Sequence, residues 1–199
     1  SPWNYPFALA MNPLVAAIAA GNCVMLRPSD KTRHSAQALR TVVSEALPEE
    51  EAVVLTGGRE LADALLELPF DHIFFTGSPS VGRKVMASAA RNLTPVTLEL
   101  GGKSPAVVDE TANLRTSAER IVWGKFVNAG QTCIAPDYVL VHESVAEGLV
   151  AAIRTAIEGA YGKEESDRLA SVDLCGVVDE TSMKRLASVL DAALGAGAK

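Results

Sequence analysis

The chain has 199 residues, of which 48% are hydrophobic and 21% are charged, a balance typical of a folded globular protein rather than a disordered one. Its net charge is −6 and no stretch concentrates Lys or Arg, so nucleic acid and anionic membranes are not expected as partners. Asn, Pro or Gly interrupts each long apolar run, so the sequence predicts no membrane-spanning segment.

The three cysteines show no C-x-x-C spacing, which argues against a zinc site and a disulfide framework, and we expect no bound metal. This favours a reducing compartment, and the expected location is cytoplasmic. Cys23 and Cys175 lie in apolar company, whereas Cys133 lies among small and polar residues in NAGQTCIAPD. Buried cysteine usually behaves as a small hydrophobe, so Cys133 is the one predicted to be accessible. The chain starts SPWNYP, without Met, and we expect it to be a fragment.

The first half of the sequence alternates short strands with helical patterns. A buried helix is predicted over 12–21, with Asn12 as its N-cap and Gly21 as its stop. Asp30 is expected to cap the next helix. The remaining predicted elements are, in chain order, strand 23–28, helix 30–47, strand 52–58, helix 59–68, strand 72–78, helix 80–92 and strand 95–100.

This alternation predicts parallel strands joined by right-handed crossovers, and therefore a doubly wound α/β sheet. Such sheets bind ligands at the carboxyl ends of their strands, where the turns TGG (56–58) and TGS (76–78) fall.

The second half continues after a break at GGKSP, and we place a domain boundary near Lys103. The chain would then divide into 1–103 and 104–199. The predicted elements of the second part are strand 104–109, helix 116–129, strand 137–142, helix 144–162 and helix 179–194.

Two glycine-rich segments approach the phosphate-binding P-loop pattern and depart from it. GGKS (101–104) lacks the glycine that should stand five residues before its second Gly, and Pro105 opposes the helix that should follow. In GSPSVGRK (77–84), Arg83 stands where the pattern requires Lys. Backbone N–H groups at a helix start can still hold an anion, so a nucleotide phosphate and a simple tight turn are both open readings of 77–84.

Cys133 is a candidate nucleophile only if other residues assist it, because most single cysteines do no chemistry. The three histidines lie in ordinary helix or strand patterns, typical of surface or packing residues. Glu99 differs, because it occupies the strand PVTLEL beside two glycines. Burial would raise the pKa of such a carboxyl and suit a general base near neutral pH. Glu99 could equally face solvent from a half-exposed strand.

Four segments, WNYP (3–6), FTGSPSVG (75–82), LELGGKSP (98–105) and NAGQTC (128–133), occur in the order and approximate spacing of the aldehyde dehydrogenase superfamily. The chain resembles that family over essentially its whole length. The chain is most similar to the class 3 group, which includes fatty, aromatic and coniferyl-aldehyde-type enzymes, in the sequences of two segments, LTPVTLELGGKSP and WGKF-x-NAGQTCIAPDY. The resemblance implies a Rossmann-like NAD(P)-binding domain over 1–103 and part of an α/β catalytic domain over 104–199.

The resemblance also implies an activity, the NAD(P)-dependent oxidation of a small-molecule aldehyde to a carboxylic acid. Cys133 matches the nucleophile, which would pass through a thiohemiacetal and a thioester. Glu99 matches the general base, and Asn4 matches the side-chain donor of the oxyanion hole.

A bound NAD or NADP follows from the same resemblance. Arg27 and Asp30 stand where the family commonly has Lys and Glu that hold the adenosine ribose, and both departures leave the choice between NAD and NADP open. The residues that the resemblance assigns to cofactor binding are Arg27, Ser29, Asp30, Phe75, Thr76, Gly77, Ser78, Val81, Gly82 and Leu100.

Two alternatives to this activity stay open. This polypeptide could by itself be an inactive fragment, because family members are considerably longer. It could also be a thiol-dependent hydrolase or acyltransferase that uses Cys133 without a nicotinamide cofactor, although the FTGS segment argues against this. The resemblance further implies a homodimer for the full-length protein, and the sequence does not define which aldehyde is used.

Overall fold

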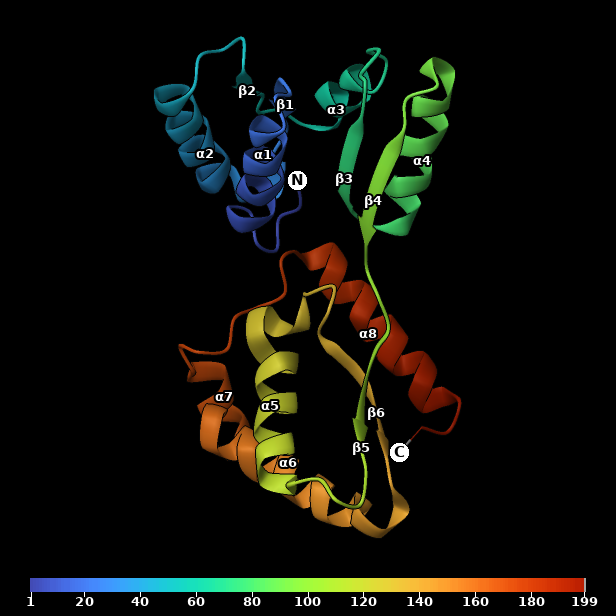
Figure 1. Ribbon diagram of the computed structural model, residues 1–199. Helices are drawn as coiled ribbons and strands as arrows, with labels where there is room; N and C mark the ends of the chain where they lie inside the picture. The colour runs from blue at the N-terminus through green and yellow to red at the C-terminus, as the bar shows by residue number, and fades with distance from the viewer. Residues whose placement is uncertain (199) are drawn as a thin grey trace. The chain divides into compact units, whose positions relative to one another are not determined.

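The computed structural model describes residues 1–198 and divides into two compact parts. Unit 1 is Ser1–Gly101 and unit 2 is Gly102–Lys199; Figure 1 colours them from blue to green and from green to red. The division falls beside the predicted boundary near Lys103. The assignment of cofactor binding to one part and catalysis to the other stays a prediction.

Unit 1 contains two parallel strand pairs, β1 with β2 and β3 with β4. A helix connects the strands of each pair, as parallel pairing requires. The elements are α1 Ala8–Ala19, β1 Val24–Leu26, η1 Asp30–Thr32, α2 Arg33–Ala46, β2 Ala52–Val54, α3 Arg59–Leu65, β3 Ile73–Gly77, α4 Pro79–Ala89, η2 Ala90–Asn92 and β4 Val96–Leu100. The predicted α/β class and parallel pairing are confirmed.

Unit 2 contains one parallel pair, β5 with β6, connected through α5. Its elements are β5 Ser104–Val108, α5 Leu114–Phe126, η3 Val127–Gly130, β6 Pro136–Val141, η4 Glu143–Val145, α6 Ala146–Tyr161, α7 Glu165–Ala170 and α8 Glu180–Gly195. The sequence did not predict α7, whose segment ESDRLA is too short and polar to show helical periodicity.

Each unit has its own apolar core. In unit 1, Leu14 of α1 and Val43 of α2 pack against Ala52 and Val54 of β2. The core of unit 2 joins β5, α5 and α6 through Val108, Ala118 and Leu149. Leu39 and Leu149 are among the largest fully buried side chains. These helix-on-strand contacts fix where the strands end, and the candidate site residues lie in the turns that follow.

Two predicted helix starts in unit 1 were wrong. The first helix begins at Ala8, and Pro13 lies within it, because the turn from Tyr5 already makes helical hydrogen bonds such as Leu9 N–H to Tyr5 O at 3.0 Å. Asp30 does not cap the second helix. It begins a 3₁₀ turn whose N-cap is Ser29, and the Ser29 hydroxyl accepts from the Lys31 N–H at 3.3 Å.

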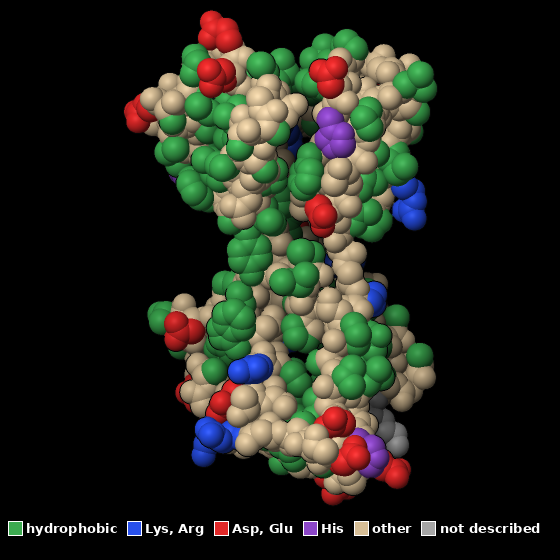
Figure 2. Space-filling model, viewed as in Figure 1, with side chains coloured by type: hydrophobic (Ala, Val, Ile, Leu, Met, Phe, Trp, Pro, Cys, Tyr) green, Lys and Arg blue, Asp and Glu red, His purple; other side chains and the backbone are tan. Residues whose placement is uncertain are grey.

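Among residues 1–198, no helix combines the length and the apolar character that crossing a membrane requires. Large apolar side chains are nevertheless exposed on both units, and hydrophobic atoms cover much of the visible surface in Figure 2. Examples are Phe74 in unit 1 and Val107, Trp123 and Ile134 in unit 2. Exposed apolar surface on this scale is typical of faces that pack against other protein.

Candidate functional site

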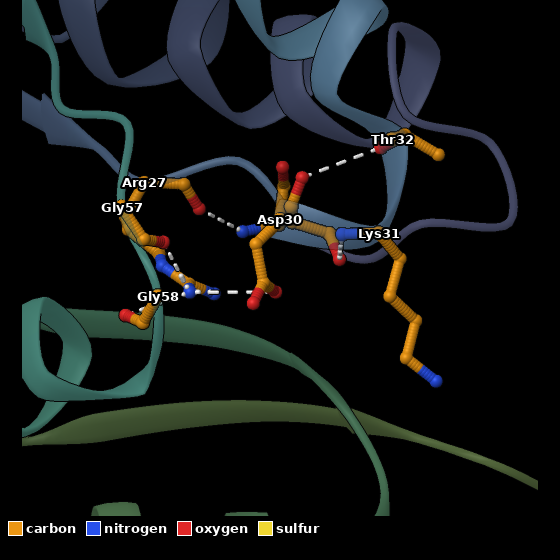
Figure 3. A network of polar contacts seen from close by, with 8 residues as sticks. Arg27, Asp30, Lys31, Thr32, Gly57 and Gly58 are labelled. Carbon is orange, nitrogen blue, oxygen red and sulfur yellow. Dashed lines mark hydrogen bonds and ion pairs between the residues drawn. The ribbon is translucent and has the colours of Figure 1, made fainter. Parts of the chain in front are cut away.

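The carboxyl ends of β1 and β2 are joined by the side chain of Arg27. Its guanidinium donates to the carbonyl of Gly57 at 2.7 Å and to that of Gly58 at 3.1 Å. The same group lies 3.6 Å from the carboxylate of Asp30 (Figure 3). Because parallel strands present their carboxyl ends at one edge, this is where an α/β sheet is expected to bind a ligand. Ser29, which is buried, lies between Arg27 and Asp30, and its hydroxyl fixes this turn by accepting a hydrogen bond from the Lys31 N–H.

Asn4 lies in the WNYP segment, which runs close to the same turn. The ammonium of Lys31 lies 5.6 Å from the centre of the Trp3 ring, a cation–π contact. The backbone nitrogen of Ser1 donates to the carbonyl of Arg27 at 2.7 Å. The predicted oxyanion donor and the predicted ribose-binding turn therefore belong to one contiguous part of unit 1.

The β3–β4 ladder aligns the two other predicted segments of unit 1. Thr76 pairs with Glu99, and Gly77 pairs with Leu100. Gly82 of α4 packs on the same strand, because a Cβ at this glycine would lie 3.1 Å from Leu100 Cδ2. The FTGS turn and the LELGG strand are thus neighbours by backbone pairing.

The β3–α4 turn presents a helix N-terminus to whatever binds there. Ser78 is the N-cap of the eleven-residue α4, and its hydroxyl accepts from the Val81 N–H at 3.4 Å. Pro79 stands at the first helical position, where the missing N–H has no partner to lose. The sequence left two interpretations of 77–84 open, a phosphate-binding turn and a simple tight turn, and this geometry fits both. The segment is a tight turn, and the dipole of the helix that follows favours an anion.

Glu99 is exposed, which is the second of the two orientations left open by the sequence. The other residues of β4 are half-buried, so Glu99 is the one exposed position of this strand. A carboxylate in this position is accessible to water and to a substrate.

Cys133 follows a backbone segment of unusual conformation. Asn128 and Ala129 both have φ of 53°, and Gly130 has φ of 72°. Three consecutive left-handed residues turn the chain sharply between α5 and β6, and the thiol of Cys133 is exposed beyond them. The accessibility of Cys133 is therefore as expected from its small and polar neighbours.

Gly102 approaches the backbone of Cys133 closely, a contact that the sequence analysis did not identify. A Cβ at Gly102 would lie 3.2 Å from the Cys133 carbonyl oxygen, whereas one at Gly101 would meet nothing within 4 Å. Beside this contact, Lys103 forms an ion pair with Asp137. The hydrogen bond from Lys103 lowers the pKa of Asp137 below its ordinary value. The GGK and GQTC motifs are thereby joined within unit 2.

The other two cysteines were expected to be buried, and this was wrong. Cys23 precedes β1 and Cys175 lies in the irregular segment between α7 and α8, and both are exposed. Apolar neighbours in the sequence do not bury a residue whose backbone lies outside the packed elements.

A hollow of about 860 Å³ lies between β6 and α6 in unit 2. Its walls are mostly apolar, including Val139, Val141 and Val150. No predicted site residue lines it, so nothing connects it with the chemistry of Cys133. Among the described residues, no cluster of three His, Cys, Asp or Glu side chains could hold a metal ion.

The structure thus brings together two groups of predicted residues, both within unit 1. Unit 1 joins Arg27, Ser29 and Asp30 at one turn and aligns the FTGS segment with Glu99 and Leu100. Unit 2 carries Cys133. The meeting of Asn4 and Glu99 with Cys133 stays a prediction.

Comparison with known proteins identifies the chain's relatives. The sequence model described as "Aldehyde dehydrogenase family" matches residues 1–199. The chain is 46% identical over 193 residues to a 4,4'-diaponeurosporen-aldehyde dehydrogenase of Staphylococcus aureus, covering 97% of the chain and 41% of the relative. It is 43% identical over 197 residues to a probable coniferyl aldehyde dehydrogenase of Pseudomonas aeruginosa, covering 99% and 40%.

Two further relatives name a cofactor. A mouse aldehyde dehydrogenase described as dimeric and NADP-preferring is 43% identical over 189 residues, covering 95% of the chain and 41% of that protein. The solved structure of a Mycobacterium tuberculosis aldehyde dehydrogenase complexed with NAD⁺ matches with a TM-score of 0.88 at 34% identity, covering 98% of the chain and 41% of that structure. The chain therefore spans about two fifths of the length of these relatives.

Proposed function

The chain belongs to the aldehyde dehydrogenase family, and from this premise we propose that the protein containing it oxidises an aldehyde to a carboxylic acid with NAD or NADP. The observation that carries the proposal is the exposed Cys133 at the end of a left-handed turn, with Gly102 of the LELGGKSP motif against its backbone. An accessible thiol on an ordered backbone is what a covalent mechanism needs.

The thiolate of Cys133 is the proposed nucleophile. The thiolate rather than the thiol is the attacking form, and sulfur in this form is intrinsically a strong nucleophile when the substrate is held close. Attack on the aldehyde carbon forms a C–S bond and moves the carbonyl π electrons to oxygen. The product of this step is a tetrahedral thiohemiacetal alkoxide.

The amide of Asn4 and the backbone N–H of Cys133 are the proposed donors to that alkoxide. A neutral amide suits this role, because it stabilises the negative oxygen without transferring a proton to it. The alkoxide then collapses to a thioester on Cys133 as the carbon loses its hydrogen with two electrons. A bound nicotinamide dinucleotide would supply the acceptor for that hydride.

Glu99 is the proposed base for the second half of the reaction. Its exposed carboxylate takes one proton from water as the water oxygen attacks the thioester carbon. The C–S bond then breaks and releases the carboxylic acid and the Cys133 thiolate, and the proton held by Glu99 passes to that thiolate or to solvent.

The residues of unit 1 fit a dinucleotide at the carboxyl ends of its strands. Ser78 and the start of α4 would hold a phosphate through backbone N–H groups, and Gly82 allows the close packing against Leu100 that shapes this turn. Arg27 and Asp30 would lie against the adenosine ribose. Arg27 already donates to two carbonyls, and a guanidinium has further donors for a hydroxyl or a 2′-phosphate.

The proposed substrate class is an aromatic or extended apolar aldehyde. Support comes from the class 3 resemblance and from relatives named for coniferyl aldehyde and for diaponeurosporen-aldehyde. With coniferaldehyde, benzaldehyde, decanal and glycolaldehyde compared in the full-length protein, kcat/KM should be lowest for glycolaldehyde. A preference for glycolaldehyde would contradict this assignment.

A homodimer in the cytoplasm is the proposed state of the full-length protein, supported by the relative described as dimeric and by the cysteine pattern. Light scattering after size exclusion should give twice the mass of one chain. A monomer mass across the micromolar range would contradict the dimer.

The test of the proposed function is Cys133→Ala in the full-length protein, with Cys23→Ala as a matched control at another exposed cysteine. Reduced cofactor, measured by its absorbance, should form in the wild type and the control but not in Cys133→Ala. Full activity of Cys133→Ala would end the proposal. Activity that consumes a thioester or ester without any cofactor would instead favour the thiol-dependent hydrolase.

A further inference from the structure

The backbone that carries Cys133 is in a conformation that needs outside support. Left-handed φ costs about 1–2 kcal/mol for most residues with a Cβ, and Ala129 adopts it directly after Asn128, a residue type that tolerates this conformation better. Gly130 continues the turn at φ 72°, where a Cβ would lie 2.9 Å from the Lys125 carbonyl. Such strained segments persist only where neighbouring contacts determine them.

Gln131 supplies such contacts with one side chain. Its Nε2 donates to the carbonyl of Asn128 at 2.9 Å, across the left-handed turn. The same Nε2 donates to the carbonyl of Gly176 at 3.2 Å, and Oε1 accepts from the Val178 N–H at 2.8 Å. One amide thus joins two segments that lie 45 to 47 positions apart in the sequence.

The segment that Gln131 reaches has no regular structure of its own. Residues 171–178 lie between α7 and α8, and the thiol of Cys175 donates to Asn128 Oδ1 at 3.8 Å. Directly after Val178, Asp179 caps the sixteen-residue α8 by accepting from the Ser182 N–H at 2.7 Å. The contacts of Gln131 therefore connect the nucleophile's backbone to the start of a long helix.

We propose that Gln131 is a positioning residue that holds the backbone of Cys133 in its reactive place by tying it to Gly176 and Val178. The consequence for catalysis rests on the proposed function of Cys133. The chemistry of the amide explains why this position is glutamine, because Gln offers a donor group and an acceptor on one rigid plane. Glutamate could accept from Val178 but would face the two carbonyls with a charge and no donor.

Two substitutions in the full-length protein separate these contacts. Gln131→Glu keeps the acceptor for Val178 and loses the donors, whereas Gln131→Met keeps the length and loses both. The sequence offers one other glutamine, the exposed Gln37 on α2, and Gln37→Glu is the matched control for the charge.

The first readout is kcat per active site, counted as the fraction of chains that become acylated at Cys133, together with KM and the cofactor Kd. A displacement of the thiol by about 1 Å should lower kcat by about 10²-fold in both variants, while the cofactor Kd stays near that of the wild type. A role in folding alone would lower the acylated fraction and leave kcat per acylated site unchanged. Values within about twofold of the wild type would overturn the proposal.

The second readout is amide hydrogen exchange, which needs no activity. Exchange in 128–133 and 176–178 should accelerate in Gln131→Met, and at Val178 it should stay slow in Gln131→Glu. Unchanged exchange in Gln131→Met would overturn the proposal that Gln131 holds this backbone. If the wild type oxidises no aldehyde but exchange accelerates in Gln131→Met, the proposed function fails, whereas the positioning role of Gln131 for the backbone is retained.

Discussion

Each unit fixes an irregular backbone segment with one side chain, but the two side chains differ in charge. In unit 1 the guanidinium of Arg27 donates to the carbonyls of Gly57 and Gly58 and faces the carboxylate of Asp30. In unit 2 the neutral amide of Gln131 joins the Cys133 loop to the segment before α8. A cation suits a turn proposed to face a dinucleotide, whereas a neutral amide orders the backbone beside a thiol without adding a charge.

The largest expected effect tests the division of roles between the two units. Asn4 of unit 1 is proposed to donate a hydrogen bond to the alkoxide formed on Cys133 of unit 2, and removing its amide tests that role. Asn4→Ala should lower kcat by about 10²- to 10³-fold, because one oxyanion-hole donor is lost. Equilibrium titration should show nearly unchanged cofactor affinity. A loss of cofactor affinity with unchanged kcat would place Asn4 in binding rather than in catalysis.

The next largest effect concerns the contact between Gly102 and Cys133. Gly102→Ala puts a Cβ 3.2 Å from the Cys133 carbonyl oxygen, and the loop must shift to admit it. We expect kcat to fall by roughly tenfold. Gly101→Ala is the matched control, because its Cβ meets nothing within 4 Å. If the two substitutions lowered kcat equally, the contact between Gly102 and the Cys133 carbonyl would not be the cause of the loss.

The left-handed turn before Cys133 can be tested through the free energy of unfolding. Gly130→Ala should lower the free energy of unfolding by about 1–2 kcal/mol, because alanine is strained at φ 72° and its Cβ meets the Lys125 carbonyl. Gly159→Ala, in α6 with open space around it, should instead raise that free energy by about 0.5–1 kcal/mol. Urea unfolding measures both. A neutral Gly130→Ala would show that the left-handed turn is not constrained.

The smallest effect is that of the ion pair between Lys103 and Asp137. Because the folded state lowers the pKa of Asp137, its ionised form stabilises the fold above its ordinary pKa, and this contribution is lost as pH falls through the lowered value. Lys103→Met should therefore lower the urea midpoint slightly at pH 7, and the difference from the wild type should shrink as pH falls below the ordinary pKa of aspartate. Lys84→Met, at an exposed lysine of α4, should show no such pH dependence.

The sequence predicted most of the fold because its apolar periodicity is local. Each strand was placed within a few residues, and the glycine turns were placed at the strand ends. The errors concern ends that depend on contacts rather than on periodicity. The first helix begins before Asn12, and Ser29 rather than Asp30 caps the turn before α2.

The candidate site was predictable only where motifs carry it. The residues of the WNYP, FTGS, LELGGK and GQTC segments could be assigned through their resemblance to the family. The contacts of Gln131 with Gly176 and Val178 could not, because nothing in an irregular segment 45 positions away marks it as a partner. The contact between Gly102 and Cys133 could not be predicted either, because the sequence does not show which of the two adjacent glycines, Gly101 or Gly102, lies against another part of the chain.

Covalent capture of the substrate on Cys133 is the claim on which the account depends most. The direct measurement is mass spectrometry of the full-length Glu99→Gln protein, quenched shortly after mixing with aldehyde and oxidised cofactor. Without its base, the protein should release one rapid equivalent of reduced cofactor and retain an acyl group on the peptide that contains Cys133. An unmodified Cys133 at the end of that burst, or an acyl group on Cys23 or Cys175 instead, would contradict the account.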